Sequence, residues 1–219
     1  MTAASVSIED YLGAIYRLQN ASGDPLPLGV LQDFFGFSPI SIHEMVQKLA
    51  QRGMADYQPY RGVKLTSFGR ETAEALVRRH RIWECFLANE LQVPIDEAHK
   101  LAGDLEHSAP DWVTERLFTH LGEPGFCPHG SKIGESNLHL AEIQLNEAEI
   151  GQKLIVTRIY PEKALVLVQA REIGLHPGQK IAVIQKDNME MKILLDDQQM
   201  TLTGETLVCV WGAEIKDEI

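Results

Sequence analysis

The sequence predicts a mainly α-helical fold with a smaller β part: an N-terminal winged helix-turn-helix, a helical middle domain and a small C-terminal β-barrel. Three observations predict this order. Apolar residues recur at the helical spacing as far as Gly53, the spacing changes to two directly after it, and short strand-like runs follow residue 148. With 219 residues, the chain is long enough to divide into two or three small cores.

Three helices are expected first, at about residues 8–18, 28–35 and 39–53. Ser7 is placed to cap the first helix, and Ser38 with Pro39 starts the third with a cap residue before a proline. Gly36 ends the second helix. A helix, a glycine-containing turn and a further helix are the signature of a helix-turn-helix.

The change of spacing after Gly53 predicts a β-hairpin. Two runs of alternating residues, 54–57 and 62–66, flank a turn that ends in Arg61. A hairpin with a basic tip directly after a helix-turn-helix is typical of a DNA-binding wing. A long amphipathic helix at about residues 68–91 then leads into the middle of the chain.

The remaining elements are short. The expected helices are 95–107, 110–121 and 164–173, with a linker at 131–145 and strands at 153–160, 180–185, 190–195 and 206–211. These strands suggest a small, partly open barrel. The predicted domains are residues 1–72 for the winged helix, 73–140 for the helical domain and 146–219 for the barrel.

The net charge of −11 argues against nucleic-acid binding when it is taken over the whole chain. Between Ser41 and Arg81, however, eight Lys and Arg stand against four acids, a local charge of 8 − 4 = +4. Such a basic island can neutralise phosphates. No apolar run reaches the roughly 20 residues of a membrane helix, and the three cysteines are widely spaced. We therefore expect a cytoplasmic protein with no membrane partner.

Five side chains behind the winged helix could bind a metal. His80 and Glu84 stand at i, i+4, while His99, Glu106 and His107 stand at i, i+7, i+8, so each group lies on one side of its helix. Imidazoles and carboxylates suit Mn(II), Fe(II), Co(II), Ni(II) or Zn(II) better than Ca(II) or Mg(II). The hypothesis is a divalent metal that controls a DNA-binding segment.

The start of the third helix carries the candidate DNA contacts. The side chains expected on its groove-facing side are Ser38, Pro39, Ser41, His43 and Gln47. Lys48, and Arg61 on the wing, are expected to meet phosphates. Since no arginine is placed for a bidentate guanine contact, specificity is expected to depend on apolar contacts and DNA shape.

In these motifs and their order, nearly the whole chain resembles the diphtheria toxin repressor family of metal-dependent transcriptional regulators. The motifs are residues 7–12, Met45-Val46-Gln47-Lys48-Leu49, the wing at 60–62 with 65–70, and Leu105-Glu106-His107. The resemblance implies a homodimeric repressor that binds a double-stranded DNA operator. It also implies that the C-terminal barrel is SH3-like.

The resemblance further implies a primary metal site formed by Asp10, Glu106, His107 and His80. A carboxylate at Asp10 favours Mn(II), with Fe(II) as the alternative. The chain departs from the family at Gly103, where a Cys or Glu ligand is usual, and at Gly13, where manganese-type members carry a glutamate. The missing ligand at Gly103 leaves the identity of the metal open.

A second site is implied by resemblance to three-domain manganese regulators. It would use Glu84, Cys127, His129 and an acid of the barrel such as Glu162, and His99 could join either site. The thiolate would be accepted more readily by Zn(II) or Fe(II) than by Mn(II).

Two rival functions stay open. A metallohydrolase could use the same residue types, but the sequence contains no HExxH motif and would leave the winged helix without a role. A regulator that has lost metal sensing is the other rival, and Gly103 gives that reading some support.

Overall fold

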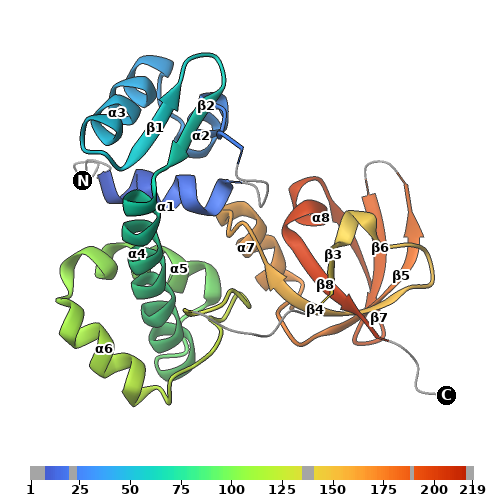
Figure 1. The fold of residues 1–219 in the computed structure, drawn as a ribbon. Coiled ribbons are helices and arrows are strands. Elements are labelled where there is room, and N and C mark those ends of the chain that lie inside the picture. The colour runs from blue at the N-terminus through green and yellow to red at the C-terminus, as the bar shows by residue number, and fades with distance from the viewer. Residues whose placement is uncertain (1–7, 20–23, 135–140, 188–189, 216–219) are drawn as a thin grey trace. The chain divides into compact units, whose positions relative to one another are not determined.

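The computed structural model describes residues 8–19, 24–134, 141–187 and 190–215, and the expected cap Ser7 lies outside these residues. The chain divides into two compact units, Met1–Arg78 and Arg79–Ile219 (Figure 1), which we call the first and second units. The division into three domains made from the sequence stays a prediction.

The first unit is a winged helix-turn-helix, as the sequence predicts. Its elements are α1 (Ile8–Leu18), α2 (Leu28–Phe35), α3 (Pro39–Gln51), β1 (Ala55–Gln58), β2 (Gly62–Leu65) and the start of α4 (Ser67–Cys85). Gly36 ends α2 with a left-handed φ of 68°, and the Ser38 hydroxyl caps α3 by accepting the Ser41 N–H. The apolar stripes of α1 and α3, including Leu12, Ile15 and Ile42, are fully buried in one core.

The wing is an antiparallel pair of β1 and β2, in register from Ala55 opposite Leu65 to Gln58 opposite Gly62. Gly62 has a φ of 130°, and a Cβ on it would lie 2.1 Å from the backbone oxygen of Leu26. Leu26 and Val63 exchange two backbone hydrogen bonds of 2.7 and 2.9 Å. A glycine is therefore required where the segment before α2 pairs with the wing.

The helical part of the second unit contains the rest of α4, a π-helical turn η1 (Phe86–Glu90), α5 (Ile95–Ser108) and α6 (Asp111–His120). The sequence predicted one continuous helix at 68–91. That was wrong after Cys85, because the backbone widens into the π-helical turn, in which Leu87 is buried in one cluster with Ala98 and Ala102 of α5.

The C-terminal part is a six-stranded antiparallel sheet in the order β3-β8-β4-β5-β6-β7. The strands are β3 (Glu142–Gln144), β4 (Lys153–Ile159), β5 (Lys180–Lys186), β6 (Glu190–Leu195), β7 (Gln198–Thr203) and β8 (Val210–Glu214). The short helices between them are η2 (Leu145–Glu147), α7 (Ala164–Glu172) and α8 (Glu205–Cys209). The buried faces of these elements share one core, so this part has the small β architecture that the sequence predicts.

Three sequence predictions in this part were wrong. The expected linker 131–145 contains β3, which pairs with β8, and the expected strand 206–211 is mostly α8 followed by β8. β7 was missed because its turn is formed by Asp196 and Asp197, both at positive φ (47° and 62°), and not by a glycine. Among the described helices, none is both long and apolar enough to cross a bilayer.

Candidate metal centre and DNA-binding surface

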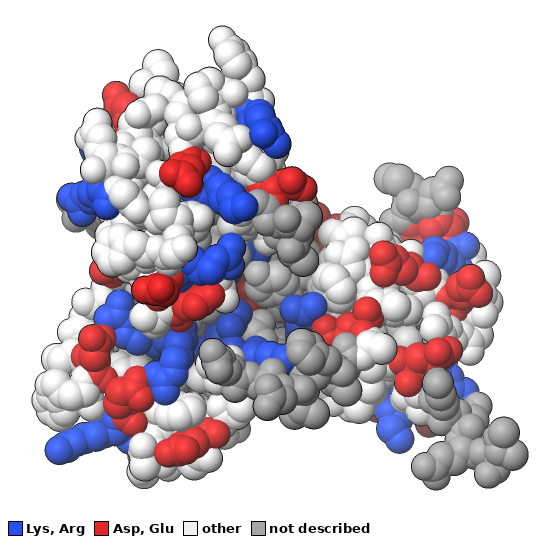
Figure 2. Space-filling model, in the orientation of Figure 1, with Lys and Arg blue, Asp and Glu red and all other residues white. Residues whose placement is uncertain are grey.

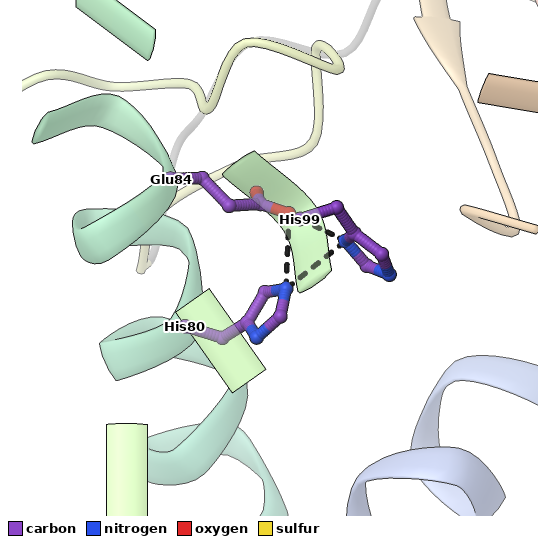
Figure 3. Close-up of side chains that lie close together, drawn as sticks. All are labelled: His80, Glu84 and His99. Carbon is purple, nitrogen blue, oxygen red and sulfur yellow. Dashed lines mark hydrogen bonds and ion pairs between the residues drawn. The ribbon is translucent and has the colours of Figure 1, made fainter. Parts of the chain in front are cut away.

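Helix α4 places His80 and Glu84 one turn apart, and both side chains are buried. Helix α5 supplies His99. Three atoms of these residues form a triangle, with 2.9 Å between His80 Nε2 and Glu84 Oε1, 2.7 Å between Glu84 Oε1 and His99 Nδ1, and 3.0 Å between the two nitrogens. Figure 3 shows the three side chains pointing toward one another.

The edges of this triangle match one face of an octahedron. In an octahedral complex with bonds of about 2.1 Å, neighbouring ligands lie about 3.0 Å apart. Two imidazoles and one carboxylate on a single face form a ligand set that leaves other positions open, and borderline first-row ions accept it. The residues therefore fit a six-coordinate divalent ion such as Mn(II) or Fe(II).

A tight turn brings Cys127 and His129 to the same carboxylate. The Cys127 carbonyl accepts the Gly130 N–H at 2.8 Å, and the Cys127 N–H donates to the Ser131 carbonyl at 2.8 Å. The turn is attached to β4, because the Ile159 N–H donates to the His129 carbonyl at 2.8 Å. The backbone thus holds both side chains in a buried position.

This second ligand set has longer edges and a softer donor. His129 Nδ1 lies 3.3 Å from Glu84 Oε1 and 3.9 Å from Cys127 Sγ. In a tetrahedral zinc site, nitrogen and sulfur ligands lie about 3.5 Å apart. A thiolate, an imidazole and a carboxylate at these separations fit Zn(II) or Fe(II) better than Mn(II).

Outer hydrogen bonds orient the ligands in both sets. His80 Nδ1 lies 2.7 Å from Glu106 Oε2, so the other ring nitrogen of His80, Nε2, faces Glu84. His129 Nε2 lies 3.3 Å from the Ile95 carbonyl, so the other ring nitrogen of His129, Nδ1, faces Glu84. The Ser131 hydroxyl donates to Glu162 Oε1 at 2.7 Å. Such partners fix the tautomer and the orientation of metal-binding groups. Ser131 carried no recognisable pattern in the sequence.

Burial and charge together set the protonation of the metal-free cluster. Burial acts to raise the pKa of Glu84, but the charges of His129 and His80 hold that pKa well below its usual value. Burial acts to lower the pKa of His129, which the Glu84 carboxylate nevertheless raises well above its usual value. Burial, together with the charge of Glu84, raises the pKa of Cys127 to about 11.

Metal binding at Cys127 and His129 is therefore expected to release protons. At pH 7 the thiol and the imidazolium each carry a proton that a cation must displace, so affinity should rise with pH. Calorimetric titration with Zn(II) in buffers of different ionisation enthalpy should give about two protons released for this site. Cys127→Ser should release about one proton fewer, and an equal count in both proteins would contradict the assignment.

The other expected ligands are placed as follows. Glu106 is buried on α5 and lies 3.4 Å from the exposed His107, measured from Oε1 to Nε2. A Cβ on Gly103 would meet nothing within 4 Å among the described residues, so glycine is not required there to avoid a collision at that atom. Asp10 is half-buried on α1 in the first unit, and its assignment to a site with Glu106 and His107 stays a prediction.

The candidate DNA contacts lie along α3, from its N-cap to its last turn, and on the wing. Exposed side chains are those of Ser38, Pro39, Ser41, His43, Lys48 and Arg61, and that of Gln47 is half-buried. The hydroxyls of Ser38 and Ser41 lie 2.9 Å apart, and His43 packs edge-on against Tyr57. On the face shown in Figure 2, basic and acidic side chains are interspersed and do not form one continuous basic patch.

Known families match successive parts of the chain. Residues 4–63 match the N-terminal DNA binding domain of iron dependent repressors, and residues 66–135 match their metal binding and dimerisation domain. Residues 143–211 match the FeoA domain.

Several transcriptional regulators are similar in sequence to large or small parts of the chain. The iron-dependent repressor IdeR of Mycobacterium leprae is 30% identical over 179 residues, which are 81% of this chain and 76% of that protein. An uncharacterised HTH-type transcriptional regulator of Methanocaldococcus jannaschii is 34% identical over 113 residues, 52% of this chain and 90% of that protein. The HTH-type transcriptional regulator MntR of Oceanobacillus iheyensis is 40% identical over 81 residues, 37% of this chain and 54% of that protein.

Two solved structures extend the similarity to the whole fold. A manganese-dependent transcriptional repressor in complex with manganese has a TM-score of 0.84 and 29% identity, over 95% of this chain and 100% of that one. ScaR with bound Zn²⁺ has a TM-score of 0.81 and 26% identity, over 96% of this chain and 100% of that one.

Proposed function

Since the chain belongs to the iron-dependent repressor family and is a metal-dependent transcriptional repressor, we propose that Mn(II) is the ion that activates it, with Fe(II) as the alternative. The active form binds a double-stranded DNA operator as a homodimer. The observation that carries the proposal is the face formed by His80, Glu84 and His99, whose edges of 2.7–3.0 Å suit a six-coordinate ion of borderline character.

The donor atoms argue for Mn(II) at the nitrogen and oxygen sites. The resemblance assigns Asp10, Glu106 and His107 to a primary site, and two carboxylates in such a set favour a hard ion. The thiolate of Cys127 belongs to the other ligand set, where Zn(II) is the natural competitor. Fe(II) accepts both kinds of donor, which makes it the second candidate.

The metal can activate repression only if it binds the DNA-binding conformation of the chain more tightly than the other conformation. An ion shifts the chain toward its DNA-binding conformation only by as much as it binds that conformation more tightly. A tenfold gain in operator occupancy needs about 1.4 kcal/mol of coupling. Because the resemblance implies an ion held by both Asp10 and Glu106, this ion would couple metal occupancy to the winged helix.

DNA binding by the full-length protein tests the proposal. Duplexes are selected from a random pool by the Mn(II)-loaded chain, and fluorescence anisotropy then measures affinity after chelation and after addition of Mn(II) or, without oxygen, Fe(II). We expect a gain of at least tenfold with metal. Equal affinity with and without metal, or no selected sequence, would reject the proposal.

Two variants separate metal sensing from DNA contact. Asp10→Ala should lose the gain caused by the metal. Arg61→Ala should keep the gain but bind more weakly in both states, with a shallower dependence on salt, because one phosphate contact is lost. Analytical ultracentrifugation of the same samples measures whether the chain is a dimer.

A further inference from the structure

Glu84 belongs to two ligand sets at once. One consists of His80, Glu84 and His99, and the other of Glu84, Cys127 and His129; in each set the donor atoms lie within 4.8 Å of one another. Glu84 Oε1 alone lies 2.9, 2.7 and 3.3 Å from nitrogens of the three histidines. The two sets therefore meet at a single carboxylate.

The second oxygen of this carboxylate is available. Glu84 is 1% exposed, and its Oε2 is buried and accepts no hydrogen bond from the described residues. A buried carboxylate oxygen in this state loses its hydration without compensation, which is costly unless a donor or a cation faces it. Because the three histidine nitrogens all lie near Oε1, Oε2 is the oxygen that can serve a second cation, since a carboxylate can bind one cation through each oxygen.

The buried acidic groups around Glu84 could carry more negative charge, once the Cys127 thiol has lost its proton to a metal, than one divalent ion neutralises. Glu84, Glu162 and the Cys127 thiolate would contribute −3, and the carboxyl of Glu162 is close enough to act electrostatically on both Cys127 and His99. One divalent ion would leave −3 + 2 = −1 in a buried site. Two would give −3 + 4 = +1, so a second ion replaces a net negative charge in this buried cluster by a net positive charge of the same size.

We propose that Glu84 bridges two cations of different character: a six-coordinate ion on the side of His80 and His99, and a thiolate-bound ion on the side of Cys127, His129 and Glu162. This inference rests on the proposed function, because it assumes a metal-responsive chain. It assigns the two sets to one dinuclear centre, in which the thiolate-bound ion fixes the shared carboxylate for its neighbour.

Cobalt(II) titration of the full-length chain distinguishes the two sides. Co(II) bound to a thiolate gives a charge-transfer absorption in the near ultraviolet, whereas Co(II) on nitrogen and oxygen does not. In the Asp10→Ala background, which weakens the primary site, we expect two tightly bound Co(II) per chain by equilibrium dialysis and elemental analysis. Cys127→Ser should remove the charge-transfer absorption and one Co(II), and His99→Gln should remove one Co(II) and keep the absorption.

The shared carboxylate is tested by Glu84→Gln, which keeps the size of the side chain. Both ions should then bind at least about tenfold more weakly, because each loses a direct ligand, and even changes behind a ligand weaken metal binding 10- to 100-fold. Glu97→Gln on the exposed part of α5 is the matched control and should bind both ions normally. Circular dichroism checks that each variant is folded.

Three results would overturn the inference. They are a single Co(II) bound per chain at saturation, a Glu84→Gln variant that binds only one of the two ions more weakly, and a charge-transfer absorption that disappears when Co(II) binds on the side of His80 and His99. DNA binding with and without Mn(II), measured on the same preparations, separates the two proposals. Metal-dependent DNA binding with a single ion at Glu84 rejects the dinuclear centre and leaves the proposed function standing. Metal-independent DNA binding rejects the proposed function itself.

Discussion

Gly130→Ala is expected to destabilise the second unit and to disrupt the thiolate side of the metal centre. Gly130 has a φ of +82°, and a Cβ on it would lie 2.0 Å from the backbone oxygen of Thr157 in β4. The left-handed backbone alone costs a non-glycine residue about 1–2 kcal/mol, and overpacking adds about 1–3 kcal/mol. Since the turn must move away from β4, Cys127 and His129 should lose their places beside Glu84.

Gly134→Ala is the matched control for this prediction. Gly134 has a φ of +79°, but a Cβ there would meet nothing within 4 Å among the described residues. Gly134→Ala should therefore lower stability only through the strain of an alanine at positive φ, without a steric clash. Urea unfolding and Zn(II) titration measure both variants, and we expect at least tenfold weaker Zn(II) binding for Gly130→Ala only. Equal Zn(II) affinities in the two variants would show that the contact with β4 does not position the ligands.

His80→Leu is expected to lower the free energy of unfolding of the metal-free second unit by about 3–5 kcal/mol. The imidazole of His80 lies between two buried carboxylates, 2.9 Å from Glu84 and 2.7 Å from Glu106. A leucine of similar size would leave both carboxylates buried without this partner. All three tryptophans, Trp83, Trp112 and Trp211, belong to the second unit, so their fluorescence during urea unfolding reports on that unit.

The pH dependence of this loss has a definite sign. Because the pKa of Glu84 is held below its ordinary value of 4.5, its interactions stabilise the folded chain fully above that pH and less as the pH falls below it. The loss in free energy of unfolding caused by His80→Leu should therefore become smaller as the pH falls below 4.5. His107→Leu, at an exposed position, should change the free energy of unfolding by less than about 0.5 kcal/mol. A deficit for His80→Leu as small as that of the control would contradict the role assigned to His80.

Local patterns in the sequence were sufficient for the winged helix. The apolar stripes of α1 and α3, the cap at Ser38 and the glycine at position 36 act over a few residues, so their effect can be read without knowing the fold. The strands β3 and β7 could not be predicted in this way. β3 has three residues and is stabilised by pairing with β8, which is about 70 residues further along the chain.

The candidate metal centre shows the same limit. Helical spacing put His80 on one side of α4 with Glu84, and the resemblance placed His80 beside Glu106. That its two ring nitrogens face two different carboxylates depends on how α5 packs against α4. The contact of Ser131 with Glu162 joins residues 31 positions apart, and no sequence pattern indicated it.

The sequence by itself determined the order of the elements in the winged helix, the types of donor atom and the family, because periodicity, capping and residue chemistry are properties of short segments. The tertiary structure decided which donor atoms lie close together. The sequence paired Glu84 with His80 on one side of a helix, and the resemblance assigned Glu84 to a second site with Cys127 and His129. Only the packing of α5 and of the turn at residues 127–131 against α4 brings it close to both groups of donors. Hydrogen bonds and ligand contacts act over about 3 Å, a scale that sequence spacing does not specify between separate elements.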